Sequence, residues 1–296
     1  MRHASKEEFN ITLKNDYAFK LLLGSEKNQA ILQDFLECVF DFPRSVLDGF
    51  EFLDKELKKD RIEDKMGVLD IHIRLKDGSH IDIEMQQLWT GEFVARSIFY
   101  LAKIYTEDFT QGSSYSRLHK CMSVNIIAEG FDLNEKIHSI YVLKEKDIGT
   151  QLGDLVEFHF FNLEKVKNLP IVCENTRENR LINWLKFINA ENKEERDMLA
   201  TTSPVLKVLN EQMNSLTLTQ EEKRLYESRM KLKSDIATIS ESSFNRGIEK
   251  GIEKGREEGF RAKAIETARK SLVMGLPIEM IVGLTGLCEE EIKKLK

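Results

Sequence analysis

Carboxylate and amide side chains flank a short turn in the first third of the chain. Asp70 precedes the turn at residues 76–78, and Glu84 and Gln86 follow it. Carboxylates are the hard oxygen ligands that Mg²⁺ prefers, and one or two of them suffice when waters and a substrate phosphate complete the coordination. A metal held in this way polarises a phosphodiester and acidifies a bound water. These residue types therefore indicate magnesium-dependent hydrolysis of a phosphodiester.

The length of the turn decides whether the two acids meet, because both flanking runs alternate with period two. One face carries the apolar residues Leu69, Ile71, Ile73, Leu75, Ile81, Ile83 and Met85. A two-residue turn would place Ile71 opposite Glu84 and mix apolar with charged side chains. A three-residue loop with Gly78 in the left-handed conformation places Asp70 opposite Glu84 and Ile71 opposite Ile83. Opposed Cβ atoms then lie about 4.5 to 5.5 Å apart, close enough for both carboxylates to share one cation.

Spacing alone leaves other interpretations of these polar residues open. Two solvent-facing strands with hydrated acids would show the same pattern. His72 and His80 share the face of the acids, but their spacing does not demand a metal. His159 lies between apolar residues and fits a position in a strand or in the core.

Residues 64–87 resemble the core of the PD-(D/E)xK nuclease superfamily, through Asp-Lys-Met-Gly-Val-Leu-Asp-Ile, then Asp-Gly, then Ile-Asp-Ile-Glu-Met-Gln-Gln. The chain is similar in particular to the Rpn family of recombination-promoting nucleases, in which glutamine often replaces the lysine of the general motif. Residues 15–20, Asn-Asp-Tyr-Ala-Phe-Lys, and residues 96–100, Arg-Ser-Ile-Phe-Tyr, also resemble that family. The likeness extends over most of the chain and is specific within residues 14–128.

This resemblance implies catalytic roles for Asp70, Glu84 and Gln86, with Asp70 and Glu84 binding Mg²⁺ and Gln86 in the place of the lysine. It implies an α/β fold, a restriction-endonuclease-like mixed β-sheet flanked by helices with a helical C-terminal extension. Because glutamine carries no charge, a cation that would stabilise the pentavalent phosphate is missing. Activity is then expected to be weak or to depend on another residue, such as Lys65. The resemblance also links the chain to recombination, mobile elements or phage defence.

Two helices beside the motif carry further candidates. Glu37 lies on a helix expected between Ser25 and Pro43, and nucleases of this superfamily often take an additional metal-binding acid from their first helix. A helix beginning near Thr90 carries Arg96 and Lys103, which bind phosphate as a planar fork and as a point charge. Ordinary alternatives are an exposed acidic helix face for Glu37 and a surface ion pair for Arg96.

Composition fits a globular intracellular protein. The 296 residues are 41% hydrophobic and 32% charged, which allows a sizeable core. The formal net charge of -6 predicts that any DNA-binding surface is local. The four cysteines lack the spacing of a zinc site and are expected to be reduced. We find no bilayer-length apolar run and no signal peptide in the sequence, so we expect a cytoplasmic protein that does not contact membranes.

We expect three segments: a nuclease-like core at residues 1–178, a helical region at 179–241 that completes or caps it, and a tail at 242–296. The core is expected to hold further strands at residues 46–57, 122–127, 139–143 and 156–161. In the tail, glycine recurs every four residues from Gly247 to Gly259. Each glycine costs a helix about 1 kcal/mol relative to alanine, so the predicted glycine-repeat helix needs compensation. Self-association would supply it, and a flexible spacer is the alternative.

The end of the tail predicts a small helix-turn-helix. Its first helix begins near Leu276 and Pro277, Gly286 forms the turn, and residues 288–295 form the second helix. The second helix of DNA readers enters the major groove by its first residues. Here those residues are Glu289, Glu290 and Glu291, which repel phosphates, so we expect partner contact or self-contact instead.

We therefore expect a Mg²⁺-dependent DNA endonuclease that forms a homo-oligomer, a dimer, through its C-terminal helices. The alternative is a non-catalytic binding or regulatory module that keeps the nuclease fold and assembles through its tail. A plain DNA-binding regulator is a third candidate, and the acidic balance of the chain disfavours it.

Overall fold

The computed structural model describes residues 10–54, 68–107, 109, 112 and 114–295. The strands are β1 (Glu51–Phe52), β2 (Ile71–Arg74), β3 (His80–Leu88), β4 (Cys121–Glu129), β5 (His138–Val142) and β6 (Val156–Asn162). The helices are α1 (Asp16–Leu23), α2 (Gln29–Val39), α3 (Arg44–Leu47), α4 (Phe93–Thr106), α5 (Arg177–Asn189), α6 (Lys193–Ala200), α7 (Pro204–Ser215), α8 (Gln220–Val273), α9 (Ile278–Thr285) and α10 (Glu289–Lys293). Short 3-10 turns are η1 (Glu26–Asn28), η2 (Tyr115–Arg117) and η3 (Leu163–Val166).

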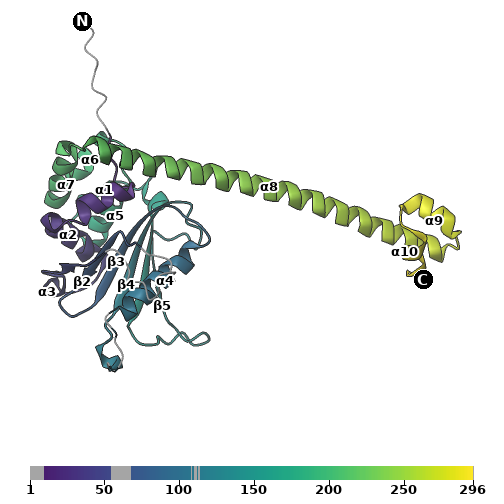
Figure 1. The fold of residues 1–296 in the computed structure, drawn as a ribbon, viewed down its shortest axis with the longest axis horizontal. Helices are drawn as coiled ribbons and strands as arrows, with labels where there is room; N and C mark the ends of the chain where they lie inside the picture. The colour runs from purple at the N-terminus through teal and green to yellow at the C-terminus, as the bar shows by residue number, and fades with distance from the viewer. Residues whose placement is uncertain (1–9, 55–67, 108, 110–111, 113, 296) are drawn as a thin grey trace, which may run out of the picture. The chain divides into compact units, whose positions relative to one another are not determined.

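The chain divides into two compact units, Met1–Lys233 and Ser234–Lys296. In the first unit the strands form one mixed sheet in the order β1-β2-β3-β4-β6-β5 (Figure 1). β3 pairs with β4 and β4 with β6 in parallel, and the other neighbours are antiparallel. Parallel neighbours need a crossover connection, and α4 provides it between β3 and β4. The expected α/β fold, a mixed sheet flanked by helices, is confirmed.

The hairpin of β2 and β3 has the predicted register. Ile71 pairs with Ile83. The loop closes through two backbone hydrogen bonds, from the Gly78 N–H to the Leu75 oxygen (3.0 Å) and from the Leu75 N–H to the Ser79 oxygen (2.8 Å). Gly78 has φ +86°, the left-handed conformation that glycine adopts without strain. The three-residue loop therefore sets which side chains share a face of the sheet.

The apolar face of the hairpin packs into the main core of the first unit. This core includes residues of β2, β3, α1, α2 and α5, and Phe35 and Trp184 meet in it with ring centroids 5.5 Å apart. One apolar residue departs from the prediction, since Leu69 packs with Leu101 and Ile104 of α4 instead. β2 begins only at Ile71, so the strand alternation does not extend back to Leu69.

The opposite face of β3 and β4 is covered by α4. The Ser97 hydroxyl donates to Asn125 Oδ1 of β4 (3.1 Å) and also lies 3.0 Å from the Phe93 backbone oxygen. Near the start of α4, Phe93 is buried with Ile127 and Phe160. This packing fixes the helix over a sheet face that carries polar side chains.

The strand expected at residues 46–57 is largely wrong. The chain forms the short helix α3 and then only β1, while residues 55–57 lie outside the described residues. Gly49 separates the two elements with φ +73°, a conformation incompatible with a continuous strand. The strands expected at 122–127, 139–143 and 156–161 are present as β4, β5 and β6.

The second unit contains the later part of α8 followed by α9 and α10. The glycines from Gly247 to Gly259 lie within the continuous helix α8. Gly286 turns the chain between α9 and α10 with φ +70°, and Ala268, Ile281, Leu287 and Ile292 form a small buried cluster. The helix-turn-helix outline is thus present. Within the described ranges, none of the helices combines the length and the apolar character that crossing a bilayer requires.

Candidate metal and nucleic-acid site

Asp70 and Glu84 meet where β2 begins beside β3. The Asp70 N–H donates to Glu84 Oε1 (3.1 Å), and the Met85 N–H donates to Asp70 Oδ2 (2.8 Å). These bonds follow from the register, because Asp70 stands one residue before the Ile71–Ile83 pair. The predicted juxtaposition of the two carboxyl groups is therefore present.

Asp82 brings a third carboxyl group to the same face of the sheet. It lies two residues before Glu84 on β3, opposite His72 of β2 and Ser123 of β4. The exposed fractions of Asp70, Asp82 and Glu84 are only 6%, 1% and 7%. The nearby Ser123 side chain lowers the pKa of Asp82 and so favours its ionised form. Even so, neither carboxylate oxygen of Asp82 makes a hydrogen bond of ordinary geometry to any described residue. Our sequence interpretation missed Asp82, although its even spacing from Glu84 placed both on one strand face.

Burial raises the pKa of all three carboxyl groups. For Asp82 and Glu84 the pKa is raised well above the ordinary value, by desolvation first and then by the negative charge of Asp70. Desolvation also raises the pKa of Asp70, while the ammonium group of Lys20 opposes that shift. Carboxylates buried side by side repel one another and favour protonation or a bound cation. The cluster is therefore suited to a cation that neutralises it.

Lys20 supplies a positive charge that we did not predict. Its Nζ lies 2.7 Å from Asp70 Oδ1. The helix that carries it begins at the Asn15 cap, whose Oδ1 accepts hydrogen bonds from the N–H groups of Tyr17 (3.1 Å) and Ala18 (3.4 Å). Residues 15–20 thus form a cap at one end and an ion pair at the other. Only the folded chain brings α1 to Asp70, so sequence spacing carried no signal for this contact.

Gln86 is held between the end of β3 and α4. Arg96 donates from a terminal nitrogen to Gln86 Oε1 (2.6 Å), and Gln86 Nε2 donates to the Leu88 oxygen (2.7 Å). The Arg96 guanidinium carbon lies 4.6 Å from the centroid of the Phe93 ring. Arg96 also favours the ionised forms of Asp82 and Glu84. The structure therefore brings Gln86 and Arg96 to the acids, with Gln86 fixing the guanidinium group.

Glu37 lies in a polar network between α2 and α5. Gln33 Nε2 donates to its Oε1 (3.3 Å), and Arg180 of α5 lies 3.8 Å from its Oε2. Asp34, on the same side, accepts hydrogen bonds from Arg180 (2.6 Å) and from the Trp184 indole (2.7 Å). These contacts join two helices of the core, and a metal-binding role for Glu37 stays a prediction.

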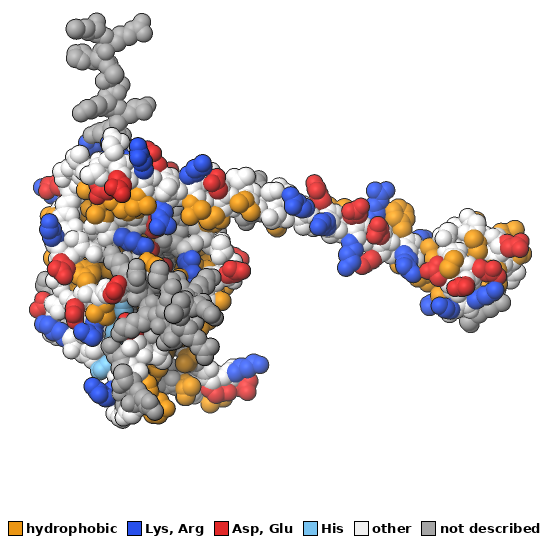
Figure 2. All heavy atoms as spheres, viewed as in Figure 1, with side chains coloured by type: hydrophobic (Ala, Val, Ile, Leu, Met, Phe, Trp, Pro, Cys, Tyr) orange, Lys and Arg blue, Asp and Glu red, His pale blue; other side chains and the backbone are white. Residues whose placement is uncertain are grey.

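Two predicted substrate-binding residues have no defined place in the site. Lys65 lies outside the described residues. Lys103 is half-buried on α4, two helical turns after Arg96, and its role also stays a prediction. On the face drawn in Figure 2, acidic and basic side chains of the described residues alternate and do not gather into one basic surface.

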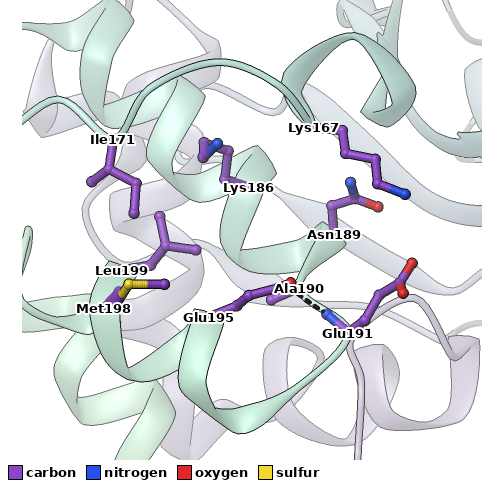
Figure 3. Close-up of a pocket in the computed structure, with 9 residues that line it drawn as sticks. All are labelled: Lys167, Ile171, Lys186, Asn189, Ala190, Glu191, Glu195, Met198 and Leu199. Atoms are coloured by element: carbon purple, nitrogen blue, oxygen red, sulfur yellow. Dashed lines mark hydrogen bonds between the residues drawn. The ribbon is translucent and has the colours of Figure 1, made fainter.

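A separate pocket of about 190 Å³ lies among residues between η3 and α6, away from the predicted site residues (Figure 3). Several of its polar groups already have hydrogen-bond partners in the surrounding chain. Lys186 Nζ donates to the backbone oxygens of Val166 (3.3 Å) and Leu169, and the Glu191 N–H donates to Glu195 Oε2 (2.9 Å). We therefore interpret this pocket as a structural feature of the packing between η3, α5 and α6.

The model of the PD-(D/E)XK nuclease family transposases matches residues 13–243. The chain belongs to this family. The match includes Lys20, the acidic hairpin and α4, so the acidic cluster lies within the residues that match the family model. Comparison with curated proteins gives no match, and comparison with solved structures gives none. The resemblance stated from residues 64–87 is thereby confirmed at the level of the family.

Proposed function

We propose that this chain is a Mg²⁺-dependent DNA endonuclease in which Asp70, Asp82 and Glu84 bind the metal. One observation carries the proposal: three buried carboxyl groups lie together, and both oxygens of Asp82 lack a hydrogen-bond partner among the described residues. Buried polar groups normally have partners, and oxygen-only ligand sets suit Mg²⁺. The carboxyl groups therefore fit this ion. When bound, Mg²⁺ supplies positive charge that polarises the phosphodiester and acidifies water.

The residues around the acids prepare the site for an anionic substrate. Lys20 holds the Asp70 carboxylate in place and favours its ionised form. Gln86 holds the guanidinium group of Arg96, which can donate two parallel hydrogen bonds to a phosphate. Burial of the carboxyl groups excludes water and strengthens these electrostatic interactions. In this scheme Gln86 is a positioning residue, and Lys20 and Arg96 provide the positive charge that the missing motif lysine would carry.

Cleavage of plasmid DNA in the presence and absence of Mg²⁺ tests this proposal. Asp82→Asn and Glu84→Gln keep the side-chain shape and remove one charge each. We expect either substitution to reduce Mg²⁺-dependent cleavage at least about tenfold, as loss of groups that tune metal sites does. The matched control is Asp132→Asn, an exposed carboxylate of the same unit, which should cleave like the wild type. Equal cleavage by all variants would contradict the proposal and would indicate a contaminating nuclease.

Burial of the acids favours one second candidate, a non-catalytic nuclease-fold module that binds DNA. Because these three residues are each at most 7% exposed, a duplex reaches their carboxyl groups only when the site opens. The same preparation distinguishes the candidates, because a binding module would retain DNA in a gel-shift assay without cleaving it at any Mg²⁺ concentration. The endonuclease proposal expects cleaved products under those conditions.

We further propose that the tail makes the chain a homodimer. Phe244, Ile248 and Ile252 recur at four-residue spacing on α8, which keeps them on one side of the helix, and all three are exposed. Such a stripe on a helix is buried when a second copy packs against it. Sedimentation of the full chain should give the dimer mass, and Ile248→Glu with Ile252→Glu should give the monomer mass. A monomeric wild type would contradict this proposal.

A further inference from the structure

We propose that His72, His80 and Glu107 form a second metal site, one that takes a borderline transition-metal ion such as Zn²⁺. One ligand atom from each of these residues lies within 4.8 Å of the others. The residues come from β2, from β3 and from the residue that follows α4. Two imidazoles and a carboxylate form a ligand set that Zn²⁺ commonly uses, whereas Mg²⁺ prefers oxygen alone. The site would therefore select a different ion from the acidic cluster.

The two imidazoles already stand near metal-binding geometry. His72 Nε2 and His80 Nδ1 are 3.0 Å apart, and both side chains are buried. Metal–nitrogen bonds of 2.0–2.1 Å in a tetrahedral site place ligand atoms about 3.4 Å apart, so the imidazoles need to separate only slightly. Glu107 is half-buried at the end of a helix, and its side chain can turn to close the remaining distance.

Another contact orients His72 as a ligand. Its Nδ1 lies 3.4 Å from the backbone oxygen of Asp54. A carbonyl oxygen only accepts hydrogen bonds, so Nδ1 carries the proton and the lone pair of Nε2 points to His80. Metal-binding histidines commonly donate their second N–H to a carbonyl or carboxylate in this way. Without metal, His80 Nδ1–H donates to His72 Nε2. Metal binding would move the His80 proton to its Nε2 and would release no proton.

The place of Glu107 also favours a cation. Glu107 is the C-cap of α4, and its N–H donates to the Ile104 oxygen (3.1 Å). The C-terminus of a helix carries partial negative charge, so a carboxylate there is unfavourable unless positive charge is close. A divalent ion bound by Glu107 would add positive charge at this helix end. It would also tie α4, which carries Arg96, to β2 and β3.

The site is separate from the acidic cluster, although both lie on one face of the sheet. His72 stands opposite Asp82, and His80 precedes Asp82 by two residues on β3. Glu84 lies two residues further along β3 and accepts a hydrogen bond from the N–H of Asp70, which stands just before β2. Substitutions can therefore remove the ligands of one site and leave those of the other.

Binding of Co²⁺ to the full chain, after treatment with a chelator, tests this inference without any measurement of cleavage. Cobalt in a tetrahedral nitrogen and oxygen site absorbs visible light strongly, and Zn²⁺ should displace it. We expect the wild type to develop this absorption, and Glu107→Gln to weaken Co²⁺ binding at least about tenfold. His80→Ala should abolish the absorption. His119→Ala, which removes an exposed histidine, and Glu84→Gln, in the acidic cluster, should bind Co²⁺ like the wild type.

If His80→Ala does not fold, the near-isosteric Glu107→Gln still decides the test. Circular dichroism of metal-free Glu107→Gln checks that this variant is folded. Zn²⁺ should raise the melting temperature of the wild type and raise that of Glu107→Gln less. Three results would each overturn the inference: a wild type without tetrahedral absorption, a folded Glu107→Gln that binds Co²⁺ as the wild type does, or an absorption lost only in Glu84→Gln. The last result would place the ion in the acidic cluster. Loss of DNA cleavage alone would bear only on the proposed endonuclease.

Discussion

Asp82→Asn should stabilise the metal-free protein and abolish its stabilisation by Mg²⁺. Asp82 is almost fully buried, and its oxygens lack hydrogen-bond partners among the described residues. Its charge is also repelled by Asp70. The substitution keeps the shape of the side chain and removes the charge. A stabilising effect is unusual for a change in a buried polar residue, so its sign alone is informative.

The expected magnitude follows from the cost of leaving a buried polar group without a partner, which is about 1–3 kcal/mol and larger for a charge. The asparagine amide remains buried and keeps part of that cost, so we expect a gain of about 1–2 kcal/mol in the free energy of unfolding. For a unit of this size, each kcal/mol shifts the melting temperature by about 2–4 °C. In the wild type, Mg²⁺ at a hundred times its dissociation constant should add about 2.7 kcal/mol.

Thermal unfolding followed by circular dichroism, with chelator or with Mg²⁺, measures both effects. Asp132→Asn is the control and should stay within about 0.5 kcal/mol of the wild type in either condition, as exposed substitutions do. The reasoning would be refuted if Asp82→Asn destabilised the metal-free protein, or if Mg²⁺ stabilised it as much as the wild type.

The same experiment has a defined dependence on pH. The folded protein raises the pKa of Asp82 and Glu84 above their values in the unfolded chain. Between the two values the folded state binds more protons, so stability contributed by these groups falls as pH rises. This contribution is fully present below about pH 4, the ordinary carboxyl range, and is lost as pH rises through the raised pKa values. The advantage of Asp82→Asn over the wild type in chelator should therefore grow from acidic to neutral pH.

Three further substitutions separate the roles of neighbouring residues. Lys20→Met removes the ammonium group that lowers the Asp70 pKa, so the acidic limb of the pH profile for Mg²⁺-dependent cleavage should move to higher pH. The control Lys20→Arg keeps a positive charge and should leave the profile unchanged. An unshifted profile for Lys20→Met would exclude this role of Lys20. Arg96→Lys removes the planar guanidinium group and its hydrogen bond to Gln86, so the affinity for DNA in a gel-shift assay should fall. An unchanged affinity would contradict phosphate binding by Arg96. Asp34→Asn weakens the hydrogen bonds to Arg180 and Trp184, so the free energy of unfolding measured in urea should fall by about 1.5–3 kcal/mol. The stabilisation by Mg²⁺ should remain. Loss of that stabilisation would connect the α2–α5 network to the metal site.

The hairpin could be predicted from sequence because local rules determine it. The alternation of apolar residues around Ile71 and Ile83 and the left-handed preference of Gly78 allow only one register that keeps a face apolar. That register brought Asp70 and Glu84 together as predicted. Asp82 obeys the same alternation, and our interpretation omitted it because it looked only for acids directly opposite each other.

Other parts depend on contacts that sequence spacing does not encode. Lys20 reaches Asp70 across 50 residues of sequence, and only the packing of α1 against the sheet brings them together. The strand expected near residue 50 was shortened by the left-handed Gly49. The glycines of α8 each disfavour a helix, yet the helix continues through them.

Diffraction from crystals of the full chain soaked in Mn²⁺, a substitute for Mg²⁺ with measurable anomalous scattering, tests the central claim most directly. The account predicts an anomalous peak within bonding distance of the carboxylate oxygens of Asp70, Asp82 and Glu84, and its loss in Asp82→Asn. A density map in which these carboxyl groups bond only to one another and to Lys20, with no peak beside them, would contradict it.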